Sequence, residues 1–114
     1  MAKLPNGNSE TVWNLKRQLA EIIEDAKGIE FALFSKFGET ERTMVYLDEL
    51  QNVAEQATER FSQFSTLQIR IANVQPQVPP DMLELVMKVI ANTEDRLPAL
   101  ERSVQEIKNE WGLS

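Results

Sequence analysis

The stretch from Leu47 to Ile71, LDELQNVAEQATERFSQFSTLQIRI, carries apolar residues in alternating steps of three and four. This spacing places one apolar stripe along a long helix, as in helices that pack against other long helices. A single polar residue, Gln68, interrupts the stripe, and we interpret it as a side chain that fixes the packing register. The stripe consists of Leu47, Leu50, Ala54, Ala57, Phe61, Phe64, Gln68 and Ile71.

Two other segments carry the same spacing, so three long helices are expected, over about residues 10–37, 39–74 and 81–111. The first has an apolar stripe of Val12, Leu15, Leu19, Ile22, Ala26, Ile29 and Leu33. The third has a stripe of Leu83, Val86, Ile90, Thr93, Leu97, Leu100, Val104, Ile107 and Trp111.

The connections between these segments are short. Gly38 follows the first stripe, at the position where a helix end needs a left-handed residue and glycine has no Cβ to clash. Residues 75–80 hold three prolines, which lack the amide hydrogen and cannot continue a helix. Pro98 falls inside the third segment, where it is expected to kink the helix or to split it. Gly28 falls inside the first, as a bend or a point of close backbone approach.

These features predict an all-α protein: an up-down-up antiparallel three-helix bundle with coiled-coil-like packing. Residues 1–8 are expected to form a disordered or frayed tail, and residues 9–114 a single domain. The alternative fold is a long helical hairpin completed by dimerisation. A β-hairpin across residues 31–46 is disfavoured because the flanking pattern is helical.

The amino-acid composition limits the classes of function that the protein can have. The 114 residues include no histidine and no cysteine, so the commonest general base, the commonest metal ligand and any thiolate nucleophile are missing. The net charge is −6 and no basic cluster is present, which disfavours binding to nucleic acid or to an anionic membrane surface. No apolar run approaches the length of a membrane span or a signal peptide, and a cytoplasmic location is expected. No cofactor is expected.

Aromatic, methionine and other apolar residues exceed what the three stripes hold. Those off the stripes, and therefore candidates for an interaction surface, are Trp13, Phe31, Phe34, Met82, Leu85, Met87 and Val89. One interpretation is a core wider than two positions per heptad. The other is an exposed apolar patch that binds another chain, because aromatic residues and methionine are enriched in interfaces. In an up-down-up bundle Trp13 would lie near the start of the third helix, with Phe31 and Phe34 at the opposite end, near Tyr46 and Trp111.

Carboxylates suggest a rival function. Glu21 and Glu24 resemble the first half of the magnesium-binding motif of all-helical nucleotide pyrophosphohydrolases, which bind the ion through glutamates three or four residues apart. Asp48 and Glu49 are poorly spaced for the second half of that motif. A solvated helix face explains these acids better, because they fall off the apolar stripes, so we assign no catalytic or metal-binding residue.

The sequence therefore favours a non-enzymatic protein–protein interaction module. It would act as an adaptor, a regulator or a small chaperone through exposed apolar helix faces, and would form a homodimer or bind another protein. The alternative is a magnesium-dependent, carboxylate-based hydrolase of the pyrophosphohydrolase type.

Overall fold

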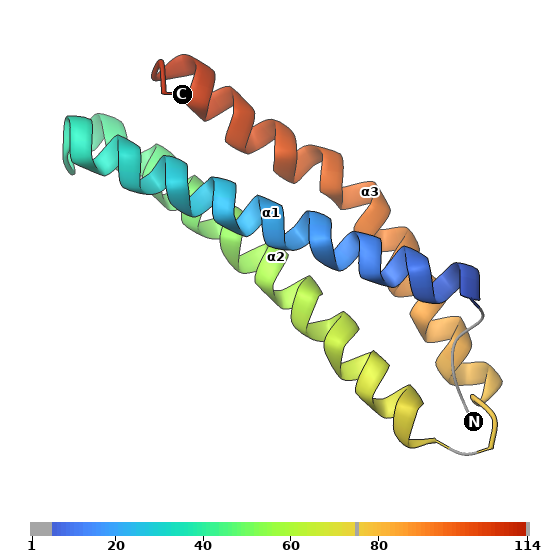
Figure 1. Ribbon diagram of the computed structural model, residues 1–114. Helices are drawn as coiled ribbons and strands as arrows, with labels where there is room; N and C mark the ends of the chain where they lie inside the picture. The colour runs from blue at the N-terminus through green and yellow to red at the C-terminus, as the bar shows by residue number, and fades with distance from the viewer. Residues whose placement is uncertain (1–5, 75, 114) are drawn as a thin grey trace.

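A computed structural model describes residues 6–74 and 76–113. Three long helices form an up-down-up bundle: α1 (Asn6–Phe37), α2 (Glu41–Asn73) and α3 (Pro80–Glu110). Figure 1 shows α1 and α2 joined by a tight turn, and α3 returning alongside both. The bundle is 55 Å long and 19 Å across, measured over its Cα atoms. The predicted all-α three-helix bundle is confirmed.

The helices form one continuous apolar core. Every residue of the predicted α1 stripe is buried, and most residues of the other two stripes are buried as well. Three further buried residues, Val53, Leu67 and Val89, lie beside those stripes. The core is therefore wider than two positions per heptad, as is common for helices in globular proteins.

Both ends of the α1–α2 connection are fixed by local interactions. Gly38 has a φ of 71°, and its amide donates to the carbonyl of Phe34 at 2.8 Å, so it ends α1 as predicted. Thr40 and Thr43 form a capping box at the start of α2, in which each side chain accepts from the other residue's amide. The Thr43 hydroxyl donates to the carbonyl of Gly38 at 2.7 Å, which ties the turn to α2.

The other helix boundaries differ slightly from prediction. α1 begins at Asn6, so the expected tail is wrong for residues 6–8, and residues 1–5 lie outside the described residues. Pro80 occupies the first turn of α3, where a missing amide costs nothing. Pro98 does not split α3, which continues to Glu110.

The C-terminal end of α3 is closed by a turn. Gly112 has a φ of 62°, and the Leu113 amide donates to the carbonyl of Lys108 at 2.9 Å. This Schellman turn buries Leu113.

Thr93 is the polar residue of the α3 stripe, and it is fully buried. Its hydroxyl has no hydrogen-bond partner among the residues that the structure describes. A buried unpaired hydroxyl costs about 1–3 kcal/mol of desolvation free energy.

We expect Thr93→Val to stabilise the protein, because valine has nearly the same shape and removes the unpaired hydroxyl. The free energy of unfolding should rise by about 1 kcal/mol, and Tm by roughly 4 °C. Thermal unfolding followed by circular dichroism measures this. Thr58→Val is the control, because Thr58 is exposed on α2 and its substitution should change stability little. A lower Tm for Thr93→Val would show that the hydroxyl is satisfied.

Candidate functional site: an apolar and acidic half of the bundle

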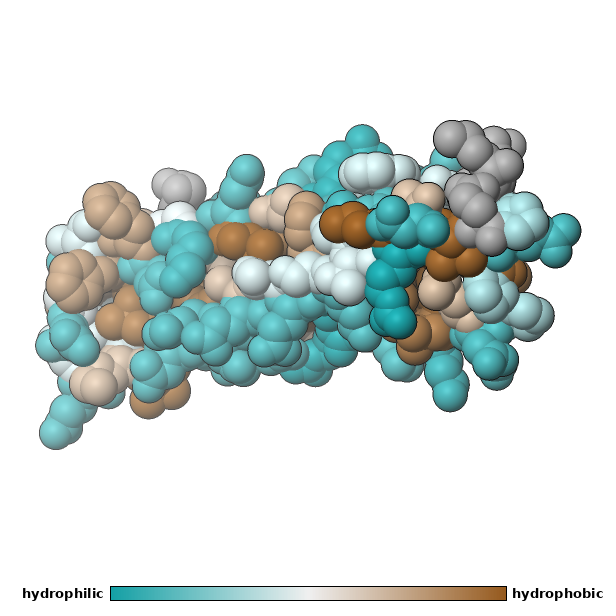
Figure 2. Space-filling model, turned by 90° about the horizontal axis from the view of Figure 1, so that it is seen from below, coloured by the Kyte–Doolittle hydropathy of each residue, from teal (hydrophilic) through white to brown (hydrophobic). Residues whose placement is uncertain are grey.

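Three phenylalanines at intervals of three residues protrude from the last turns of α1. Phe31, Phe34 and Phe37 are 74%, 53% and 45% exposed. Side chains three residues apart are neighbours on a helix surface, so these rings form one oblique row, called here the phenylalanine row. Met44 and Val45, just beyond the turn in α2, are exposed as well. Figure 2 shows apolar side chains gathered at this end of the bundle, at the left of the view.

Trp111, which directly follows α3, contacts aromatic side chains of α1 and α2 at this end of the bundle. Its ring centroid lies 4.9 Å from that of Phe37 in α1 and 5.4 Å from that of Tyr46 in α2. The Arg42 guanidinium lies 5.2 Å from the Trp111 ring. The Tyr46 hydroxyl donates to Glu110 Oε1 at 3.0 Å, and this hydrogen bond raises the pKa of Tyr46 above its usual 10.0. The expectation that Tyr46 and Trp111 meet at this end is thus confirmed. These contacts hold Phe37, the last ring of the row, against the end of the bundle.

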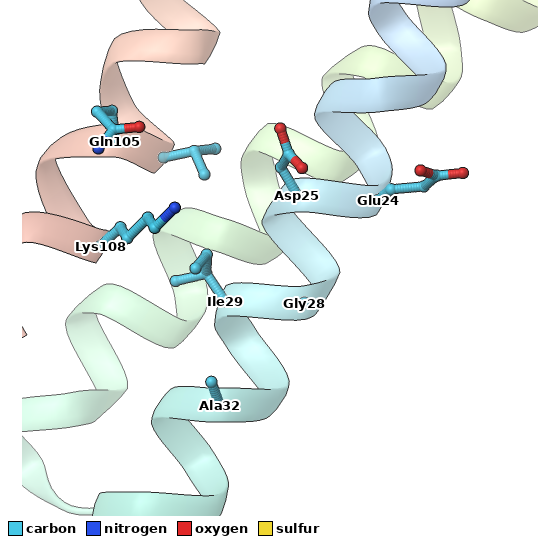
Figure 3. A pocket seen from close by; sticks show the side chains of 8 residues that line it. Glu24, Asp25, Gly28, Ile29, Ala32, Gln105 and Lys108 are labelled. Atoms are coloured by element: carbon cyan, nitrogen blue, oxygen red, sulfur yellow. The ribbon is translucent and has the colours of Figure 1, made fainter. Parts of the chain in front are cut away.

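A groove of about 320 Å³ runs between α1 and α3 in the same part of the molecule (Figure 3). Ile29 and Val104, both buried, and Ala32 are its apolar residues, and most of its exposed surface is polar. Figure 3 shows the Lys108 side chain extending from α3 into the groove, whereas Glu24 points away from it. The other lining residues are Asp25, Gly28 and Gln105.

Gly28 forms part of the α1 wall of this groove. Its backbone is helical, and a Cβ placed on it would meet nothing within 4 Å. Glycine inside a helix costs about 1 kcal/mol relative to alanine. Of the two interpretations of Gly28, a bend or a close backbone approach, the second finds no support within the described residues.

Charge is distributed unevenly along the bundle. We call residues 21–56 and 97–113 the turn half, and residues 6–20, 57–74 and 76–96 the proline half. The turn half holds twelve acidic and five basic residues, whereas the proline half holds six of each. The phenylalanine row and the groove therefore both lie in the half that carries a strong negative charge.

The proline half has scattered exposed apolar side chains. Trp13 in α1 and Ile69 in α2 are both more than half exposed, and Leu85 and Met87 in α3 are also exposed. Met82 is half-buried against the core. Val89 is 5% exposed, so its assignment to an interaction surface is wrong. It faces inward because the core of α3 is wider than the predicted stripe.

Lys16 is a site that the sequence analysis missed. It is only 7% exposed, and its Nζ donates to Gln68 Oε1 at 2.8 Å. The ammonium group also lies 4.5 Å from the centroid of the Trp13 ring and 4.7 Å from that of Phe61. Gln68, which was predicted to fix the packing register, is thus the hydrogen-bond acceptor for a buried cation. Burial lowers the pKa of Lys16 below the usual 10.5.

The stability contribution of Lys16 should depend on pH. Between its lowered folded pKa and 10.5, the unfolded chain binds a proton that the folded protein does not, so folding becomes more favourable as pH rises through this window. Lys16→Met keeps the apolar stem and removes the titration. We expect the free energy of unfolding of the wild type to increase relative to Lys16→Met as pH approaches 10.5. Urea unfolding at a series of pH values measures the difference, and parallel pH profiles would contradict it.

The carboxylates of the rival hydrolase hypothesis are not brought together. Glu21 and Glu24 lie on exposed positions of α1, and Asp48 and Glu49 on exposed positions of α2. Over residues 6–74 and 76–113, no group of three or more acidic residues is placed to hold a metal ion.

No protein-family model, curated protein or solved structure matches the chain. Within the described residues, none of the three helices is long and apolar enough to cross a membrane.

Proposed function

We propose that this protein is a non-enzymatic helical module that binds other proteins through apolar side chains on its outer surface. The observation that supports the proposal is the phenylalanine row, in which three large aromatic side chains of one helix are about half exposed or more. Contiguous exposed apolar patches on soluble proteins usually mark interaction sites. Phe37, the last ring of the row, packs against Trp111, so this part of the surface needs little ordering on binding. A cytoplasmic location stays a prediction from the sequence.

We also propose that the protein forms a homodimer through its proline half. Trp13, Leu85 and Met87 provide exposed apolar anchors there, and tryptophan and methionine are enriched in interfaces. The proline half has equal numbers of acidic and basic residues, so two copies can approach through it without net repulsion. Two turn halves would bring together surfaces that are both strongly acidic, which is unfavourable.

Sedimentation velocity over a wide concentration series tests this dimer. We expect the sedimentation coefficient to rise with concentration, and Met87→Glu to weaken self-association roughly tenfold or more, because it places a charge in an apolar contact. Phe31→Glu is the control: it adds the same charge, but in the turn half. A monomer at every concentration would reject the homodimer. Loss of the dimer in Phe31→Glu alone would place the interface in the turn half instead.

A further inference from the structure

A hollow of about 250 Å³ lies between the last turns of α2 and the first turns of α3, which are at the same end of the bundle (Figure 1). Most of its exposed surface is apolar. Its apolar lining residues are Leu67, which is buried, Met82, which is half-buried, and Pro79 and Leu85, which are exposed. Unlike the α1–α3 groove, this hollow therefore offers apolar atoms to another molecule.

Two opposite charges line the same hollow. Arg70 lies in the last turn of α2 and Asp81 in the first turn of α3, and both are exposed. The single ion pair among the described residues joins Lys27 and Glu30, so neither of these two charges is paired within that part of the chain. Each sign suits its helix end, because the helix dipole favours bases at the C-terminus and acids at the N-terminus. Both charges stay available to a partner.

The charges and the shape of this surface are complementary to themselves. In a two-fold symmetric contact, residue i of one copy meets residue j of the other, and j meets i. A two-fold axis through the hollow would place Arg70 of each copy beside Asp81 of the other. It would also let each exposed Leu85 contact the apolar hollow of the opposite copy. A partner carrying charge of one sign would be attracted by one of the two charges and repelled by the other.

We propose that the α2–α3 hollow is the centre of a two-fold symmetric contact between two copies of this chain, with two Arg70–Asp81 ion pairs between the copies. The proposal rests on the homodimer proposed above for the proline half, and it adds the surface and the residues that pair. Exposed ion pairs contribute little affinity, so the apolar contacts of Met82 and Leu85 supply most of the binding while the charges fix the orientation.

Reversing the two charges one at a time tests the pairing. Arg70→Glu would place an acid opposite Asp81 in both halves of the contact, and Asp81→Arg would place a base opposite Arg70. Sedimentation velocity measures self-association, and each variant should associate about tenfold more weakly than the wild type. Arg17→Glu and Glu10→Arg, which make the same changes at exposed positions of α1 in the proline half, are the controls and should change association much less.

An equimolar mixture of the two single variants separates the ion pairs from other effects. The Arg70→Glu copy presents two acids at the hollow and the Asp81→Arg copy presents two bases, so both pairs of a mixed dimer are attractive again. We expect the mixture to associate about as strongly as the wild type. Both variants keep a net negative charge, so overall attraction cannot explain a recovery. A weakened helix end would lower Tm and would not be repaired by mixing. A mixture that stays dissociated would overturn the proposal.

Leu85→Ala tests the apolar part of the contact and should weaken self-association roughly tenfold. Val45→Ala, which truncates an exposed apolar residue in the turn half, is its control and should have no effect. A monomer at every concentration would reject the homodimer and the hollow together. A dimer that Met87→Glu weakens, but that Leu85→Ala and both charge reversals leave intact, would keep the homodimer of the proline half and reject the hollow alone.

Discussion

The structure depends on the mutual burial of three apolar stripes along a bundle only 19 Å across. So thin a bundle encloses one narrow core, because each helix turns little more than one face inward. Apolar residues outside that core must stay at the surface. The exposed phenylalanines, methionines and tryptophan follow from this geometry.

The two halves of the molecule combine this apolar surplus with different electrostatics. In the turn half, the phenylalanine row lies where acidic residues outnumber basic ones. In the proline half the numbers of acidic and basic residues are equal. Both halves therefore expose apolar side chains, but in two different electrostatic environments.

The sequence predicted the backbone well because its signals are local. The α1 stripe, Gly38 and the prolines before α3 each report on a few neighbouring residues. It failed where burial depends on three helices at once. Val89 lies beside the predicted stripe, but the lateral packing of α3 encloses it. From sequence alone Lys16 would be assigned to the surface, because Gln68 and Phe61, which contact it, belong to α2. The i, i+3 spacing of Gly28, Phe31, Phe34 and Phe37 was visible in the sequence, but the groove beside it was not.

The three-residue connection between α1 and α2 also bears on how the bundle assembles. A loop this short has a small closure entropy, and its glycine and capping box already favour the reversal of direction. We therefore expect the α1–α2 hairpin to form early in folding, and α3, which follows the longer proline-containing link, to dock onto it later. During that interval the faces that will receive α3 are open to solvent. Folding would then expose, for a short time, the apolar stripes of α1 and α2 that α3 covers in the finished bundle.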